Sequence, residues 1–221
     1  MKRGKLIVFE GTDGSGKSTQ VKLLFNYLKR KGISSKIISF PRYDKFYGNL
    51  AGRVLKGEFG GNSLSPYLTA LPFATDRLMA KKKINRWLDG GQIVLVDRYV
   101  GSSLAHQGAK LRGEKQKELV EWVLRMEYKI NQLPREDIVI FLDLPVNLTQ
   151  NLLKIRNLKK DIAEKDVEYQ KQSIKLYHDL IDKFKHWQTV KGVDEKGKLL
   201  SKDEMHQRIL RILKQGKIIG S

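Results

Sequence analysis

The chain has 221 residues, no cysteine and a formal net charge of +19. This length suffices for one substantial α/β core, and we expect a single domain over residues 1–221. The lack of cysteine excludes disulfides and thiolate metal sites and favours a cytoplasmic location, and no apolar run is long enough to suggest a membrane span or a secretory leader.

The positive charge permits two interpretations. Lysine and arginine surfaces bind nucleic acids by releasing counterions from the phosphate backbone. Here the basic residues are spread along the chain instead of forming one block. A cleft that holds two phosphorylated nucleotides also needs cations. The pattern therefore favours a basic cleft over nucleic acid as a partner.

The first predicted strand leads into a phosphate-binding loop. Residues 5–10 form an apolar run typical of a buried strand, and residues 11–18, GTDGSGKS, satisfy G-x-x-x-x-G-K-[ST]. Apolar residues then recur at helical spacing through residues 21–28. Such glycines let backbone N–H groups surround phosphate oxygens at the positive end of the helix. The motif predicts a nucleoside triphosphate site made of Gly11, Thr12, Asp13, Gly14, Ser15, Gly16, Lys17, Ser18 and Thr19.

Two further features complete the expected phosphate chemistry. Lys17 of the motif is expected to reach the β- and γ-phosphates, and the Ser18 hydroxyl to ligate Mg²⁺. Residues 92–97 read as a buried strand that ends in Asp97. A carboxylate at such a strand end orders Mg²⁺ directly or through water. The expected cofactor is therefore Mg²⁺ with ATP.

The remaining elements alternate between strands and helices. Strands are predicted at residues 36–40, 137–144 and 187–190, in addition to 5–10 and 92–97. Helices are predicted at 49–58, 65–89, around 119–130, after Pro145, around 174–184 and at 201–213. Strands separated by helices throughout predict one parallel, doubly wound sheet.

Five segments, in this order, resemble the thymidylate kinase family. They are residues 9–20 (FEGTDGSGKSTQ), 40–42 (FPR), 73–77 (FATDR), 97–99 (DRY) and 102–110 (SSLAHQGAK). The similarity runs over nearly the whole chain. It implies a three-layer α/β/α P-loop kinase fold with about five parallel strands, a helical lid near residues 156–166 and a homodimer packed through helices. It also implies phosphorylation of dTMP to dTDP by ATP, for dTTP synthesis.

The resemblance implies roles for individual residues in the acceptor site. Asp13 would accept a hydrogen bond from the sugar 3′-hydroxyl, Phe73 would stack on thymine, and Arg77 would donate to thymine O4. Arg42 and Arg98 would clamp the dTMP phosphate, because guanidinium groups match phosphate oxygens in pairs. The expected pocket is completed by Tyr99, Ser102, His106 and Gln107.

The sequence departs from the family at two positions. Gly14 stands where some members carry an arginine that points at the transferred phosphate. Lys159 and Lys160 of the lid are therefore expected to supply that cation, with Arg156 near the ATP base. His106 stands where many members have an aromatic residue that crowds the sugar 2′ position, which predicts weaker rejection of ribonucleotides.

The expected mechanism needs no general base, because the attacking dTMP phosphate is already anionic near neutral pH. The predicted catalytic groups are Lys17, Asp97, Arg98, Lys159 and Lys160.

Two other readings remain open at this point. A related kinase could use another nucleotide or a deoxynucleoside, although a neutral hydroxyl acceptor usually needs a carboxylate base, and the pair Arg42 and Arg98 favours an acceptor that carries phosphate. A non-enzymatic alternative is a GTP switch or a DNA-partitioning ATPase. The sequence lacks the N-K-x-D motif that reads guanine, and salt-dependent DNA binding would support the second possibility.

Overall fold

The structure is a computed structural model, and it describes residues 3–155 and 167–220. Five strands form one sheet in the order β2-β3-β1-β4-β5, and every pair is parallel. The strands are β1 (Leu6–Glu10), β2 (Ser35–Ser39), β3 (Ile93–Asp97), β4 (Ile138–Asp143) and β5 (Trp187–Lys191). The predicted parallel α/β fold is therefore confirmed.

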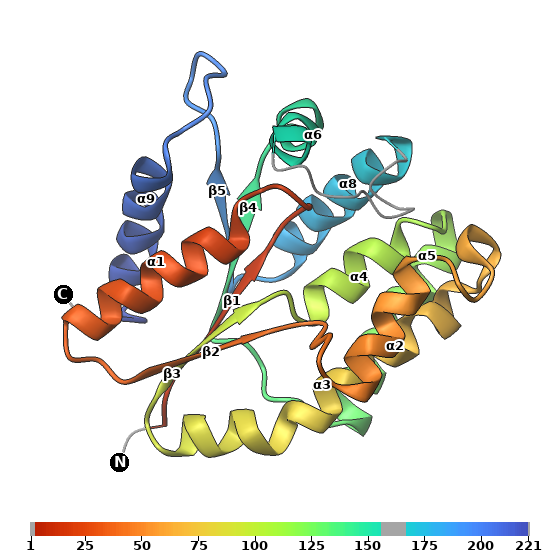
Figure 1. Cartoon of the computed structure of the whole chain (residues 1–221), viewed down its shortest axis with the longest axis horizontal. Coiled ribbons are helices and arrows are strands. Elements are labelled where there is room, and N and C mark those ends of the chain that lie inside the picture. The colour runs from red at the N-terminus through yellow and green to blue at the C-terminus, as the bar shows by residue number, and fades with distance from the viewer. Residues whose placement is uncertain (1–2, 156–166, 221) are drawn as a thin grey trace.

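Helices cover both faces of this sheet (Figure 1). On one face lie α1 (Lys17–Arg30) and α9 (Lys202–Gln215), and on the other α3 (Pro66–Asp89), α4 (Val100–Gly108), α5 (Gly113–Leu124) and α8 (Val167–Lys183). The other helices of the described residues are α2 (Phe46–Leu55), which packs on α3, the 3₁₀ turn η1 (Gly61–Ser63), the π-helical segment η2 (Arg125–Ile130) and α6 (Val146–Ile155).

Strand side chains divide the core into two parts. Along β1, Leu6 and Val8 face the cluster that includes α3, α4, α5 and α8, whereas Ile7 and Phe9 face the cluster that includes α1 and α9. Successive side chains of a strand point to opposite faces, so a strand covered on both sides must be apolar at every position. This is why β1, β3 and β4 appear in the sequence as continuous apolar runs.

The helix α4 was not predicted. It begins three residues after β3 ends, and it contains glycines, which lower helix propensity. Gly101 is required by packing: a Cβ there would lie 2.6 Å from the Trp187 ring and 2.9 Å from Glu10 Oε1. Because α4 packs so closely on the sheet, it needs glycine at this position, and the glycine lowers the helix propensity by which the sequence would identify the helix.

Other boundaries differ by a few residues. The helix predicted at 49–58 is α2, which begins at Phe46, and the helix predicted around 119–130 is α5 followed by the π-helical η2. The final helix is preceded by Ser201, which exchanges hydrogen bonds with Glu204 in a capping box.

In the described part of the chain, no helix is long and apolar enough to cross a membrane.

Glu136 is a buried carboxyl at the approach to β4. It is 8% exposed and accepts a hydrogen bond of 2.6 Å from the Tyr128 hydroxyl. Burial raises the pKa of Glu136 to about 7, from 4.5, although the Tyr128 hydrogen bond opposes the rise. Between these two pH values the folded chain holds a proton that the unfolded chain has released.

This proton should make stability fall as pH rises from about 4.5 to about 7. Glu136→Gln keeps an oxygen for Tyr128 but cannot lose a proton. We expect the wild type to lose about 1–3 kcal/mol more than the variant between pH 5 and pH 7. Urea unfolding at several pH values measures the difference, with the exposed Glu118→Gln as control. Identical pH profiles for Glu136→Gln and wild type would contradict the assignment.

Candidate active site

The loop between β1 and α1 is shaped to receive an anion. Gly16 occupies the N-cap of α1 with φ 92, a left-handed conformation that glycine adopts without strain, and no side chain caps the helix. The first N–H groups of α1 are therefore available to a ligand. Thr12 Oγ1 and Ser15 Oγ are buried and have no hydrogen-bond partner among the described residues. Unpaired polar atoms at this place fit a polyphosphate.

Lys17 is folded back over this loop. Its ammonium group donates to the carbonyl oxygens of Gly11 (3.0 Å) and Thr12 (2.8 Å). Burial, and then the charge of Arg98, lower the pKa of Lys17 to about 8. A buried ammonium whose contacts are neutral carbonyl groups is well placed to bind negative charge.

Arg98 connects the loop to the next strand. Its guanidinium donates to Asp13 at 2.5 Å and to Ser102 at 3.1 Å. Partial burial alone would raise the pKa of Asp13, but the charges of Arg98 and Lys17 outweigh it and hold that pKa well below the usual range.

Glu10 was quoted within a motif but given no role, and the structure places it at the centre of the site. Its carboxylate is fully buried and accepts hydrogen bonds from the backbone N–H groups of Tyr99 (2.8 Å) and Ser102 (3.0 Å). It also accepts from the hydroxyls of Ser102 (2.6 Å) and Tyr177 (3.0 Å). Glu10 thus fixes the turn that presents Arg98.

Arg42 is held by a carboxylate that sequence analysis did not assign. It follows β2, and Asp76 of α3 accepts hydrogen bonds from its backbone N–H (2.7 Å) and from its Nε (3.0 Å). The Asp76 side chain is fully buried, whereas Arg42 keeps 17% of its side chain exposed. The arginine therefore has a fixed base and an accessible edge.

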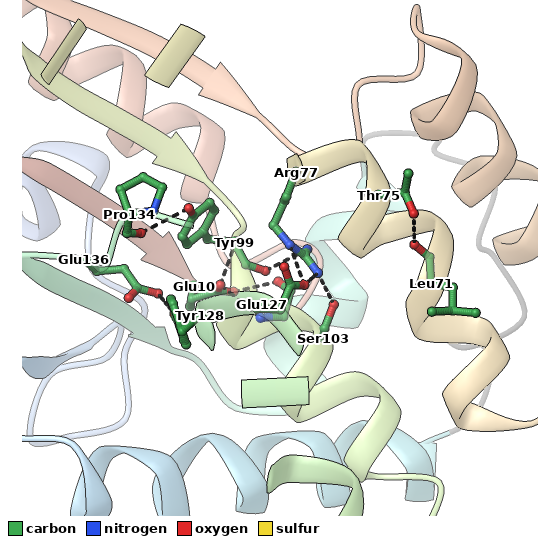
Figure 2. Close-up of polar contacts among 11 residues, drawn as sticks. Glu10, Leu71, Thr75, Arg77, Tyr99, Ser103, Glu127, Tyr128, Pro134 and Glu136 are labelled. Carbon is green, nitrogen blue, oxygen red and sulfur yellow. Dashed lines mark hydrogen bonds and ion pairs between the residues drawn. The ribbon is translucent and has the colours of Figure 1, made fainter. Parts of the chain in front are cut away.

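The Arg77 side chain is buried, and Figure 2 shows its polar contacts. Its Nε and Nη2 donate to Glu127 of the π-helical segment, Nη2 also to Ser103 (2.7 Å), and Nη1 to the backbone carbonyl of Tyr99 (3.1 Å). Both partners of the ion pair are at most 2% exposed. Glu127 Oε2 has no hydrogen-bond partner among the described residues.

The other predicted pocket residues divide into two groups. Phe73 is half-buried one helical turn before Arg77, and Gln107 is buried with an Oε1 that has no partner in the described part of the chain. Tyr99 instead lies in the core, where its hydroxyl donates to the Pro134 carbonyl at 3.2 Å. Its backbone carbonyl, rather than its ring, contributes to the site.

The same loop and strand end offer few groups that could bind a metal ion. Among the described residues, no group of three or more His, Cys, Asp or Glu side chains could hold a metal ion. Mg²⁺ bound with a nucleotide needs one or two protein ligands, because phosphates and waters supply the rest. Ser18 is exposed at the start of α1, and Asp97 lies at the end of the neighbouring strand β3. This sparse ligand set fits Mg²⁺ that arrives with ATP.

Three predicted residues lie outside the described part of the chain. Arg156, Lys159 and Lys160 all fall within residues 156–166, together with the predicted lid.

The buried Arg77–Glu127 pair predicts a strong, non-additive effect on stability. Arg77→Met leaves Glu127 as an uncompensated buried charge, which should cost about 3–5 kcal/mol of unfolding free energy. Adding Glu127→Gln should recover part of that loss. Denaturant unfolding of the two single variants and the double variant measures the coupling.

The exposed pair Arg53–Glu58 provides the control. Its side chains are 49% and 40% exposed, so Arg53→Met should cost less than about 1 kcal/mol. Additive effects of the two changes at Arg77 and Glu127 would show that the pair is not coupled.

Comparison with known proteins identifies the family to which the chain belongs. The family model described as thymidylate kinase matches residues 9–217. A probable thymidylate kinase from Pyrococcus abyssi is 34% identical over 214 residues, covering 96% of this chain and 97% of the relative. The thymidylate kinase of Mycobacterium tuberculosis is 32% identical over 181 residues, covering 79% of this chain and 85% of the relative.

A solved structure has the same fold. The thymidylate kinase from Candida albicans superposes with a TM-score of 0.77 at 24% sequence identity, covering 99% of this chain and 96% of the other. With the phosphate-binding loop, the paired arginines and a family match over nearly the whole sequence, the chain belongs to the thymidylate kinase family and is an enzyme that phosphorylates dTMP.

Proposed function

We propose that this kinase transfers the γ-phosphoryl group of ATP directly and in line to a phosphate oxygen of dTMP, with Mg²⁺ bound to the donor. In this step the bond between the bridging oxygen and the γ-phosphorus breaks as the new one forms, and ADP leaves. The observation that carries the proposal is the convergence of the phosphate-binding loop with Arg98 and Arg42 at the ends of neighbouring parallel strands.

The arrangement answers the main difficulty of the reaction, which is to bring two polyanions together. Lys17 would bind the β- and γ-phosphates, while Arg98 and Arg42 would hold the acceptor phosphate. Ser18 and Asp97 would hold Mg²⁺, which supplies charge neutralisation at the transferred group. The acceptor oxygen is already anionic, so no side chain has to remove a proton.

Selection of thymine over other nucleotide bases would depend on the hydrogen bonds that fix the Arg77 guanidinium. A guanidinium has five N–H donors, and the four hydrogen bonds to described residues leave one Nη1 hydrogen for the base. A fixed donor pairs with the 4-oxo group of thymine and opposes the 4-amino group of cytosine. Phe73, half-buried on the same helix face, would stack on the ring.

The sugar would lie between the loop and α4. Asp13 would accept from the 3′-hydroxyl, and Ser102, His106 and Gln107 would line the pocket, in which Tyr99 takes part through its backbone. The unpaired Gln107 Oε1 supports a polar ligand there.

An acceptor screen tests the proposed function. With ATP and Mg²⁺, we expect ADP release with dTMP and with its analogue lacking the 5-methyl group. With dCMP we expect a kcat/KM about 10–100-fold lower, because the Arg77 donor meets another donor. Thymidine, which lacks the acceptor phosphate, should not react. The ribose counterpart of dTMP measures the effect of His106 on sugar selection. Efficient use of thymidine would overturn the phosphate-acceptor proposal.

A cation at the transferred phosphate is proposed for Lys159 or Lys160, with Arg156 near the adenine. Gly14 leaves the loop without an arginine, and a lysine supplies a point charge. Replacing both lysines by alanine should lower the single-turnover rate while nucleotide affinities stay nearly unchanged, as expected for an interaction made in the transition state. A rate within about threefold of wild type, under 1 kcal/mol of barrier, would instead favour Arg98.

We also propose that the enzyme acts in the cytoplasm, because its composition is free of cysteine.

We further propose that the enzyme forms a homodimer through α3. One stripe along this helix is apolar and exposed, and it consists of Leu68, Leu71, Leu78 and Met79. Leu71→Glu with Met79→Glu should therefore halve the mass measured by sedimentation velocity, whereas Lys22→Glu on α1 should not. An unchanged mass for the double variant would exclude this surface.

A further inference from the structure

Tyr169 lies in the first turn of α8, and nothing in the sequence patterns assigned it a role. Its ring stacks on the imidazole of His106 in α4, with ring centroids 6.1 Å apart and planes inclined by 24°. Its hydroxyl lies 2.9 Å from the backbone carbonyl oxygen of His106 and 3.3 Å from His106 Nδ1. On the opposite edge of the same ring, Nε2 lies 3.2 Å from Arg98 Nη1. His106 thus stands between Tyr169 and the arginine of the acceptor site.

These contacts determine where the imidazole carries its proton. A guanidinium has N–H donors and no acceptor, so Nε2 of His106 must accept the hydrogen bond from Arg98. A neutral imidazole that accepts at Nε2 carries its hydrogen on Nδ1. The Tyr169 hydroxyl hydrogen goes to the His106 carbonyl, which leaves the phenol oxygen to accept from Nδ1–H. Each group then has a partner of the correct kind.

Electrostatics supports the same protonation state. Burial, followed by the charge of Arg98, lowers the pKa of His106 to about 3. The imidazole is therefore neutral at physiological pH, and its two nitrogens differ in role.

The position of the Arg98 guanidinium depends on the tautomer of His106. Its Nη1 donates to Ser102 and to His106, and its Nη2 donates to Asp13. If His106 carried its hydrogen on Nε2, that N–H would face the N–H of Arg98 and push the guanidinium away. We propose that Tyr169 is a positioning residue that fixes the tautomer of His106 and, through it, the guanidinium of Arg98 at the acceptor phosphate.

This inference rests on the proposed role of Arg98 in binding the dTMP phosphate, and it adds a residue of α8 to the acceptor site. It also gives His106 a task besides any contact with the sugar. The tautomer is a property of the free protein, so it can be measured without substrate.

The kinetic test uses Tyr169→Phe, which removes the hydroxyl and keeps the ring. We expect kcat/KM for dTMP to fall about threefold to tenfold, mainly through KM, while KM for ATP stays within about twofold. Tyr27→Phe, on α1 at the other face of the sheet, is the matched control and should leave both constants unchanged.

A second background separates positioning from general damage. In His106→Gln the amide oxygen can accept from Arg98 whatever its neighbour does. In that background we expect Tyr169→Phe to change kcat/KM for dTMP less than about twofold relative to His106→Gln alone. An equal loss in both backgrounds would overturn the proposal.

Nitrogen-15 NMR of the histidine side chains gives a readout that does not depend on activity. The His106 signals, assigned by their loss in His106→Gln, should show a protonated Nδ1 and an unprotonated Nε2 in the wild type, and a mixture of tautomers in Tyr169→Phe. A protonated Nε2 in the wild type would overturn the proposal. If dTMP were not phosphorylated at all, the proposed function would fail, and the NMR result would still decide the tautomer.

Discussion

The carboxylate of Glu10 joins the elements from which the active site is built. It ends β1, and its four hydrogen bonds go to the turn after β3, to the first residues of α4 and to α8. A buried carboxylate is costly unless donors surround it, so this arrangement is stable as a complete set. Removal of one donor would leave part of the buried charge without a hydrogen-bond partner. The position of Arg98, between Asp97 and the anchored Tyr99, follows from this set.

Each of the three arginines proposed for the acceptor site is held by an acid from another part of the chain. Arg42 pairs with Asp76, Arg77 with Glu127 and Arg98 with Asp13. A chain with a net charge of +19 would otherwise place these groups among repelling neighbours. Holding each guanidinium before substrate arrives reduces the ordering that binding has to impose. The exposed fraction of the side chain falls from 17% in Arg42 to 2% in Arg77, which is consistent with the proposed contacts of Arg42 with the phosphate and of Arg77 with the base.

Sequence patterns predicted the sheet, most helices and the phosphate-binding loop, because each depends on neighbouring residues. Apolar runs identified the strands, and the spacing of glycines and Lys17 identified the loop. The partners of the arginines were not predicted: Glu127 lies 50 residues from Arg77, Asp76 lies 34 from Arg42, and Tyr169 lies 63 from His106. No local period relates such residues, and the π-helical turn that presents Glu127 has no strong sequence signature. The family resemblance supplied the candidate binding residues, whereas the hydrogen bonds that support them were found only in the structure.

The division of the core into two clusters has a consequence for engineering the enzyme. The three arginines, the acids Asp76 and Glu127, and His106 lie on or beside the elements that cover one face, whereas α9 and the later turns of α1 cover the other. Substitutions in the interface between α1 and α9 should therefore disturb the site on the opposite face little, as long as the strands of the sheet keep their register. Attempts to raise thermal tolerance, or to graft a tag or a fused domain, are therefore best directed to that second face.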